Sequence, residues 1–429
     1  MSGSSSVGLI HGTVLALALG FLPGPAGAAD PVADGAAVPS DPVFTVHLIE
    51  GKTLSGQLRQ LGPSDRLTLV SAQGPDRVVP LDQVVKVTRD GPPAVYAPEV
   101  PVVLLPDGDR LFRAVVGVTK DMSIEVQQYI LGNLNIPLDS LAGLVFGLPA
   151  GESEDADLIL DRMRRDPRTT EVLWLSNGDR LVGNFLGLDE TKVRFQTENG
   201  TLSLEQSGVS GLAFDPALIS YPRPAGTFLE LTLSDGSRLG VQHVRIDQGQ
   251  IAATTRFGAE VRIPLNELLA AHPRSDRLVY LAERPVAREQ SIPYVGPSRP
   301  FQRDRTVDGH LFRLGGQTYD RGLGTASRSF LAYRLDPGDQ RFQAQVGLDD
   351  RAGALGNLVF RVLVDGKERY ASPPMSVRDT PRAVDVDVAG GSVLILVTDF
   401  GDRGGVRDFA DWAEARLVRS GTPQRPSAH

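Results

Sequence analysis

The last third of the chain contains two stretches that decide its fold, Tyr319-Asp320-Arg321-Gly322-Leu323-Gly324-Thr325 and Asp408-Phe409-Ala410-Asp411-Trp412-Ala413-Glu414-Ala415-Arg416. Between them, runs of strand length are separated by turns that contain glycine and aspartate. Residues 342–348 alternate large apolar side chains with polar or small ones, the pattern of a strand with one buried face. Residues 359–365 and 393–399 are almost entirely apolar, as in strands buried inside a sandwich. The sequence therefore predicts an antiparallel β-sandwich at residues 278–419.

The order of these segments resembles that of the NPCBM family, which is related to carbohydrate-binding module family 51. The Gly-x-Gly turn, the strand at residues 330–335 and the closing Asp-x-Ala-Asp-Trp-Ala-x-Ala-Arg stretch follow one another as they do in that family. The resemblance implies a jelly-roll-type β-sandwich that binds a glycan or a cell-surface polysaccharide. Where the family commonly has histidines, this chain has Ala326 and Phe409, so sugar contacts made by those histidines would be altered.

Three aromatic residues are candidate carbohydrate-binding residues: Tyr319, Tyr370 and Trp412. An aromatic face packs well against the apolar face of a sugar. For Trp412 the neighbouring alanines favour the other interpretation, in which the ring anchors the core of the sandwich.

Four carboxylates form a candidate metal site: Asp399, Asp402, Asp408 and Asp411. Calcium takes several oxygen ligands from loops, and glycines separate these acids. Asp349 and Asp350 are possible further ligands. The alternative interpretation is a set of solvated loop acids without a metal.

Before the sandwich, one pattern recurs four times: an apolar strand, a polar turn with glycine, then leucine and a second strand. The turn glycines are Gly51, Gly108, Gly178 and Gly236, and Asp-Gly and Asn-Gly pairs are strong hairpin signals. A second match follows each turn: Val79-Pro80-Leu81-Asp82, Ile136-Pro137-Leu138-Asp139, Leu202-Ser203-Leu204-Glu205 and Ile263-Pro264-Leu265-Asn266. The pattern predicts tandem small SH3-like or Sm-like barrel repeats, which at about 50 residues need packing against a neighbour to be stable.

The predicted layout is all-β except for one short helix. Residues 152–167 predict that helix, with acidic residues early and basic residues late, as the helix dipole favours. The predicted parts are a signal peptide at 1–28, repeat 1 at 43–90, repeat 2 at 100–149, the helical insertion at 152–167, repeat 3 at 171–216, repeat 4 at 227–273 and the NPCBM-like sandwich at 278–419.

Composition and targeting signals narrow the class of protein. The 429-residue chain has no cysteine and a net charge of −8, which excludes disulfides and disfavours nucleic-acid binding. Residues 14–22 are apolar and precede Ala26-Gly27-Ala28, a small-x-small site typical of secretory cleavage, although no lysine or arginine precedes Lys52. This apolar run is too short to span a bilayer. We expect a secreted, periplasmic or cell-surface protein with no membrane span in the mature chain.

The search for catalytic motifs finds none. The six histidines are scattered, and neither a Gly-x-Ser-x-Gly elbow nor a P-loop is present. The sequence favours an exported non-catalytic protein whose sandwich binds glycan and whose repeats form a scaffold. Two alternatives stay open: a structural envelope protein without sugar binding, whose repeats contact other envelope proteins, and an unrecognised glycoside hydrolase.

Overall fold

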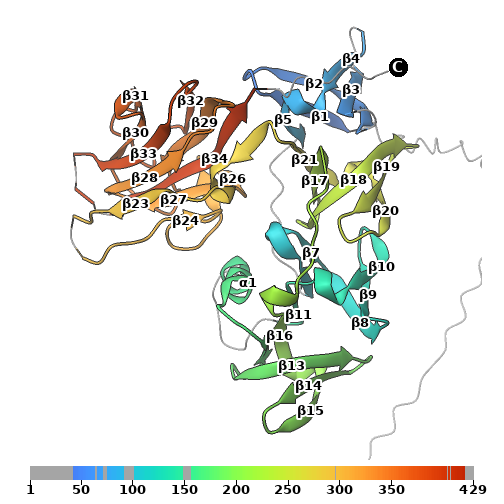
Figure 1. The fold of residues 1–429 in the computed structure, drawn as a ribbon. Helices are drawn as coiled ribbons and strands as arrows, with labels where there is room; N and C mark the ends of the chain where they lie inside the picture. The colour runs from blue at the N-terminus through green and yellow to red at the C-terminus, as the bar shows by residue number, and fades with distance from the viewer. Residues whose placement is uncertain are drawn as a thin grey trace, which may run out of the picture. The chain divides into compact units, whose positions relative to one another are not determined.

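The computed structural model describes residues 42–62, 65–70, 75–90, 101–147, 156–294, 296–402, 404–405 and 407–420 (Figure 1). They all belong to one structural unit, Asp41–His429. The predicted signal peptide lies outside the described residues. Within them, no helix is both long enough and apolar enough to cross a membrane.

The first two thirds of the chain consist of short antiparallel strands. Repeat 1 contains β1 (Val43–Leu48), β2 (Thr53–Leu61), β3 (Arg66–Val70), β4 (Arg77–Pro80) and β5 (Val84–Arg89). Repeat 2 contains β6 (Val102–Leu104), β7 (Arg110–Phe112), β8 (Ala114–Lys120), β9 (Ser123–Gln128), β10 (Gly132–Pro137) and β11 (Gly143–Val145). Repeat 3 contains β12 (Glu171–Leu175), β13 (Arg180–Leu188), β14 (Lys192–Thr197), β15 (Gly200–Glu205) and β16 (Val209–Ala213). Repeat 4 contains β17 (Phe228–Leu233), β18 (Arg238–Asp247), β19 (Gln250–Thr255), β20 (Glu260–Pro264) and β21 (Leu268–Arg274).

The four repeats share one strand order. In repeat 1 the first strand pairs with both the second and the last, and the second, third and fourth follow as a meander. Repeats 3 and 4 have the same pairings. In repeat 2 the long second strand is divided into β7 and β8 at Arg113, whose φ is 52°. This common order confirms the predicted tandem small β repeats.

The repeated Gly turn has the same backbone geometry in each repeat. The turn glycines Gly51, Gly108, Gly178 and Gly236 have φ of 82°, 85°, 92° and 85°. This left-handed region is open to glycine without steric cost, which explains why the residue recurs there. In each turn a leucine at the end of the first strand or just after it donates its N–H to a carbonyl four residues later, as from Leu48 to Lys52 at 2.8 Å.

A single 3₁₀ turn precedes the last strand of every repeat. These turns are η2 (Leu81–Gln83), η4 (Leu138–Ser140), η5 (Gln206–Gly208) and η7 (Leu265–Glu267). The sequence comparison matched Leu204 to Leu81, but in the structure Gln206 takes that place. In repeat 3 the turn therefore begins two residues later than the sequence match predicts. It begins with the polar Gln206, whereas the turns of the other repeats begin with leucine.

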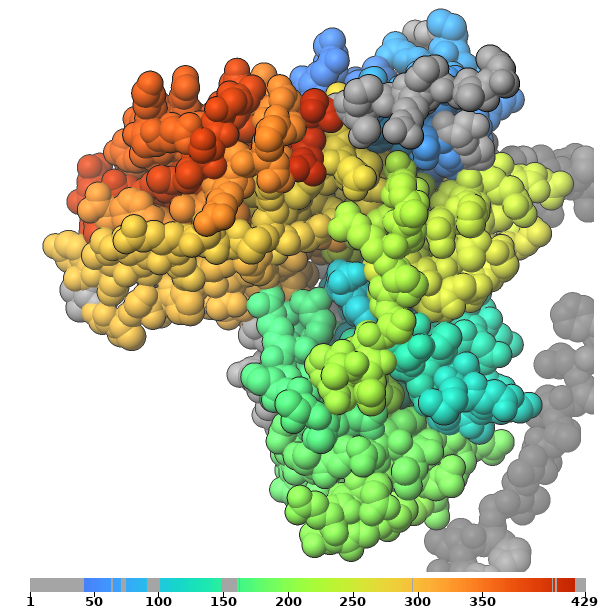
Figure 2. All heavy atoms as spheres, in the orientation of Figure 1, coloured from blue at the N-terminus to red at the C-terminus, as the bar shows by residue number. Residues whose placement is uncertain are grey.

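The repeats join through their last strands. β11 pairs with β16, so that repeat 2 adjoins repeat 3, and β5 pairs with β21, so that repeat 1 adjoins repeat 4. Apolar residues of all four repeats belong to one buried cluster. The link between β16 and β17, which includes η6 (Pro216–Leu218), runs over the surface in Figure 2. The helix α1 (Ala156–Arg165) packs Leu160 and Met163 against repeat 2.

The C-terminal part is a sandwich of two antiparallel sheets. One sheet has the order β24 (Gln302–Arg303), β27 (Gly322–Ala326), β34 (Phe409–Arg419), β29 (Asp339–Leu348), β32 (Arg382–Asp387), and β22 (Leu278–Tyr280) also pairs with β34. The other has the order β23 (Arg288–Ser291), β28 (Ser329–Arg334), β33 (Val393–Phe400), β30 (Leu358–Val364), β31 (Lys367–Ala371). A separate hairpin comprises β25 (Phe312–Leu314) and β26 (Gln317–Tyr319).

Trp412 occupies the centre of the sandwich. Its side chain is 0% exposed, and its ring lies edge-on to Phe360 at 5.1 Å between centroids and near Phe342 at 6.2 Å. Its indole N–H donates to the Thr398 hydroxyl at 3.1 Å, so that one bond links the two sheets. A buried indole that keeps its hydrogen bond contributes its full apolar area to stability.

We expect Trp412→Ala to lower the free energy of unfolding by about 3–5 kcal/mol, the usual cost of deleting a large buried aromatic side chain. Urea titration of the full chain checks this value. Tyr294→Ala, at a side chain that is 67% exposed, is the control and should change stability by less than about 0.5 kcal/mol. Equal effects would contradict the core position of Trp412.

A buried ion pair joins repeat 1 to the sandwich. Lys86 Nζ lies 3.0 Å from a carboxylate oxygen of Glu414, and both side chains are largely buried. Burial favours the neutral acid, but Lys86 and Arg416 outweigh it and lower the pKa of Glu414 to about 2.

Because the pKa of Glu414 is lower in the folded state than its usual 4.5, its stabilising effect is complete above pH 4.5 and is lost as the pH falls toward 2. We expect Glu414→Gln to flatten the fall of unfolding free energy over that range. Urea midpoints between pH 2.5 and 6 test this, with exposed Glu125→Gln as the control. Parallel pH profiles for Glu414→Gln and the wild type would contradict it.

Candidate functional site

A hollow of about 210 Å³ lies at one end of the sandwich. It is bordered by the segment after β23, by the end of β27 and by the start of β34, where Ala326 pairs with Phe409. The two positions at which this chain departs from the family pattern therefore lie next to each other on neighbouring strands. Both positions border this hollow.

The aromatic rim of the hollow comes from Tyr294 and Phe409. The Tyr294 ring lies edge-on to Phe400, with 5.5 Å between centroids, and packs against Gly404 and Gly405. A Cβ at either glycine would come within 3.3 Å of Tyr294, so the glycines leave room for the ring. Arg299 places its guanidinium 5.3 Å from the centroid of the half-buried Phe409 ring. Tyr294 thus has a fixed position and an exposed face.

The polar wall of the hollow is formed by Ser327 and Asp408. The Ser327 hydroxyl donates to one oxygen of Asp408, and the other oxygen accepts the Asn357 N–H at 2.9 Å. Burial raises the pKa of Asp408, and these two hydrogen bonds oppose that shift. An aromatic rim beside fixed hydroxyl and carboxylate groups offers both apolar and hydrogen-bonding contacts to a small polyhydroxyl ligand.

The structure places the three predicted aromatic residues on separate elements. Trp412 is in the core of the sandwich and exposes no ring face. Tyr319, on β26, is 8% exposed, and its hydroxyl donates to Gln317 at 3.1 Å. Burial raises the pKa of the Tyr319 hydroxyl to about 12. Tyr370 is half-buried on β31 and packs against the sandwich core. None of the three borders the hollow.

The four predicted metal ligands also have different surroundings. Asp399 forms ion pairs with Arg328 at 3.0 Å and Arg361 at 3.5 Å. Asp408 accepts the two hydrogen bonds from Ser327 and Asn357 described above, and Asp402 is exposed. Across the described parts of the chain, no group of three or more His, Cys, Asp or Glu side chains is arranged to hold a metal ion. Calcium binding stays a prediction.

Asp411 is the one of these four acids whose surroundings suit a bound cation or proton. It is fully buried, and neither carboxylate oxygen has a hydrogen-bond partner among the described residues. Burial and then the neighbouring Asp349 carboxylate raise the pKa of Asp411 well above its usual value. Its charge can be relieved by a proton, which Asp411 would donate to Asp349, or by a metal ion.

Reasoning from sequence did not identify Tyr294, Arg299 and Ser327 as site residues. Tyr294 lies in Ile292-Pro293-Tyr294-Val295-Gly296-Pro297, where an aromatic residue in a Pro- and Gly-containing loop was the available signal. The departures at Ala326 and Phe409 were noticed, but the strand pairing that brings them together is visible only in the structure.

Comparison with known proteins finds a relative that matches less than half of this chain. A Renibacterium salmoninarum protein named as an endo-alpha-N-acetylgalactosaminidase is 32% identical over 180 residues, which are 39% of this chain and 12% of that protein. The chain therefore spans a small part of this relative.

Two Clostridium perfringens structures are similar to part of the chain. A CBM51 module of GH95, solved with methyl-galactose, is 27% identical with a TM-score of 0.30, and the match covers 33% of this chain and 99% of the module. The CBM51-2 and INT domains of ZmpB, solved with GlcNAc, are 23% identical with a TM-score of 0.31, over 42% and 40% of the two chains. The NPCBM/NEW2 domain model matches residues 279–418. The chain carries an NPCBM/NEW2 domain, a carbohydrate-binding type of β-sandwich, at those residues.

Proposed function

We propose that this protein is an exported, non-catalytic glycan-binding protein whose NPCBM domain holds a sugar in the hollow between Tyr294 and Phe409. The observation that carries the proposal is the combination, within a domain of this family, of an exposed aromatic ring and fixed polar groups around one hollow. The four repeats serve as a spacer or as a scaffold for contacts with envelope proteins.

The shape and chemistry of the hollow support a small neutral sugar unit. Its volume of about 210 Å³ is below the usual range for drug-sized ligands, which suits one sugar residue or the end of a chain. Tyr294 supplies a ring face for stacking, while Ser327 and Asp408 supply polar groups for hydroxyls. Asp408 is already bonded twice within the protein, so it positions Ser327 as well as facing the ligand.

A glycosidase activity is the second candidate, and the name of the Renibacterium salmoninarum relative is what favours it. The match between the two covers 12% of that protein and 39% of this chain. Turnover of N-acetylgalactosaminide substrates by the purified full chain would establish that activity. Glycan binding without turnover supports the binding protein.

We expect the full chain to bind a defined set of structures on a glycan array, and Tyr294→Ala to weaken that binding by at least about tenfold, as for aromatic hot spots. The matched control is Tyr129→Ala, because Tyr129 is 68% exposed on repeat 2 and Tyr294 is 67% exposed. No binding by folded protein would favour the structural envelope role. Binding that is equally strong in Tyr294→Ala would place the sugar elsewhere.

We propose calcium as a structural ion of the sandwich, with Asp411 and Asp349 as the acids whose repulsion it would relieve. Calcium should raise the thermal midpoint of the full chain relative to EDTA, because a ligand that binds only the folded state stabilises it. Asp411→Asn should abolish that shift, and exposed Asp247→Asn in repeat 4 should keep it. Identical midpoints in calcium and in EDTA would contradict calcium binding and would leave a shared proton between the two acids.

A further inference from the structure

A second cavity, of about 460 Å³, lies where the sandwich meets repeats 2 and 4 and helix α1. Eight arginines and five acidic residues border it, so its lining is positively charged although the whole chain carries −8. Its position is distinct from the hollow at Tyr294, and the two cavities share no lining residue.

Glu230 and Glu283 contact four guanidiniums at the centre of this cavity. Glu230, on β17, accepts from Arg321 at 2.6 and 2.8 Å and from Arg238 at 3.3 Å, and Arg274 lies 3.5 Å away. These three cations outweigh the effect of burial and lower the pKa of Glu230. Arg238 also lies 4.0 Å from both Asp109 and Asp320, so Glu230 is chiefly the partner of Arg274 and Arg321.

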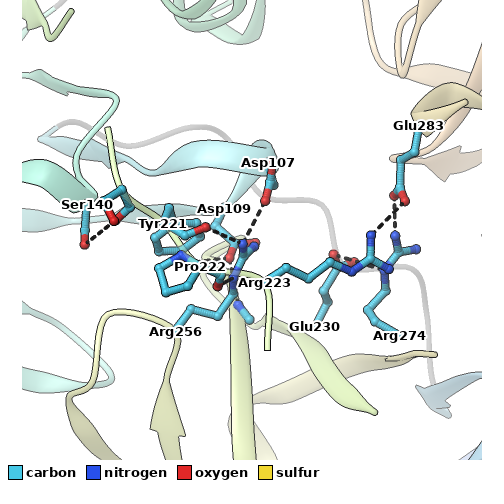
Figure 3. A network of polar contacts seen from close by, with 12 residues as sticks. Asp107, Asp109, Ser140, Tyr221, Pro222, Arg223, Glu230, Arg256, Arg274 and Glu283 are labelled. Atoms are coloured by element: carbon cyan, nitrogen blue, oxygen red, sulfur yellow. Dashed lines mark hydrogen bonds and ion pairs between the residues drawn. The ribbon is translucent and has the colours of Figure 1, made fainter. Parts of the chain in front are cut away.

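Glu283, in η8 (Leu281–Glu283), is the second carboxylate. It pairs with Arg321 at 2.7 Å. It also pairs with Arg223 at 3.7 Å and closely with Arg274, both labelled in Figure 3. Arg274 and Arg321 thus share both acids, and Arg223 depends on Glu283. Over the whole lining, eight arginines face five acids, and cationic charge without compensation is costly where water is largely excluded.

Arg274 is an arginine of this cluster with N–H groups that have no hydrogen-bond partner. Its side chain is 3% exposed and its Nε lies 3.5 Å from a Glu230 oxygen, while its Nη1 has no hydrogen-bond partner among the described residues. The guanidinium lies 4.8 Å from the centroid of the Tyr280 ring, which holds its plane in place. A buried guanidinium with unused donors, fixed at the wall of a cavity, is a preformed partner for a planar or tetrahedral oxyanion.

We propose that this cavity binds an oxyanion, either the carboxylate or sulfate of an acidic saccharide or a free inorganic anion of the same chemistry. Arg274 would donate its unused N–H groups to the anion, and Arg223 at the half-exposed rim would add a second guanidinium. Because the lining comes from both the repeats and the sandwich, the bound anion would hold these two parts together. The site is independent of sugar binding at Tyr294.

The test is isothermal titration calorimetry of the full chain with sodium sulfate, sodium glucuronate and glucose, at constant ionic strength set with chloride. We expect saturable binding of sulfate and glucuronate and none of glucose. Tighter binding of glucuronate than of sulfate would identify an acidic saccharide as the source of the anion. Tighter binding of sulfate would identify a free inorganic anion. Absence of binding for both anions would overturn the proposal.

Substitutions of the lining arginines test where the anion binds. Arg274→Gln and Arg223→Gln should each weaken anion binding by about tenfold or more, because each removes a charge-assisted donor. The control for Arg223, whose side chain is 54% exposed, is Arg341→Gln, at a similarly exposed arginine paired with Asp385 on the sandwich. Arg223→Gln keeps the test valid should Arg274→Gln fail to fold. Unchanged affinity in Arg223→Gln, or equal loss in Arg341→Gln, would also overturn the proposal.

Discussion

A β repeat of about 50 residues buries too little apolar surface to be stable by itself, and the architecture of this chain depends on that constraint. The repeats satisfy this constraint by pairing in twos: the last strand of one repeat pairs with the last strand of another, β11 with β16 and β5 with β21. Both junctions cover strand edges that would otherwise be open to pairing with other molecules. The joined sheets also create one apolar core from four small ones. Once the repeats are fixed in this way, polar groups such as Glu230 and Lys86 face the sandwich in defined positions.

The contacts between the repeats and the sandwich are both apolar and polar. Ile49 and Val85 of repeat 1 form a small buried cluster with Leu278 and Val418 of the sandwich. Glu230 meets Arg321, and Lys86 meets Glu414, with all four side chains largely buried. Buried ion pairs add little net stability compared with apolar packing, because desolvation offsets their attraction. They do, however, strongly disfavour arrangements that separate the partners. The apolar cluster and the charge pairs together define the junction, and the same charges line the cavity for which we propose anion binding.

Much of the fold was predictable because it depends on local chemistry. Asp-Gly and Asn-Gly turns, period-two alternation and apolar runs each identify a strand or hairpin, and the structure has β28, β29, β30 and β33 where those patterns occur. The two-residue offset of repeat 3 was missed because Gln206 lacks the apolar side chain that marks the turn elsewhere. The pairing of repeat 1 with repeat 4 was not predictable, since no local pattern specifies which distant edge a strand will join.

The candidate site was harder to predict than the fold, because it depends on contacts between distant segments. The sequence indicated the right domain and the two unusual positions, Ala326 and Phe409. It did not indicate Tyr294, which reaches the hollow through a loop that packs on Gly404 and Gly405. Trp412, the most conspicuous aromatic residue in the sequence, is instead part of the core.

The pairing of β5 with β21 has a consequence for how the chain matures during synthesis. β5 ends at Arg89 and its partner β21 begins at Leu268, which is 179 residues later. The outer edge of repeat 1 therefore stays uncovered until those residues have been synthesised. At the usual rate of translation this interval is roughly 10–40 s. During that time an open strand edge is available to any neighbouring chain. A protein built in this way benefits from any factor that keeps the nascent chain unfolded until its fourth repeat has been made.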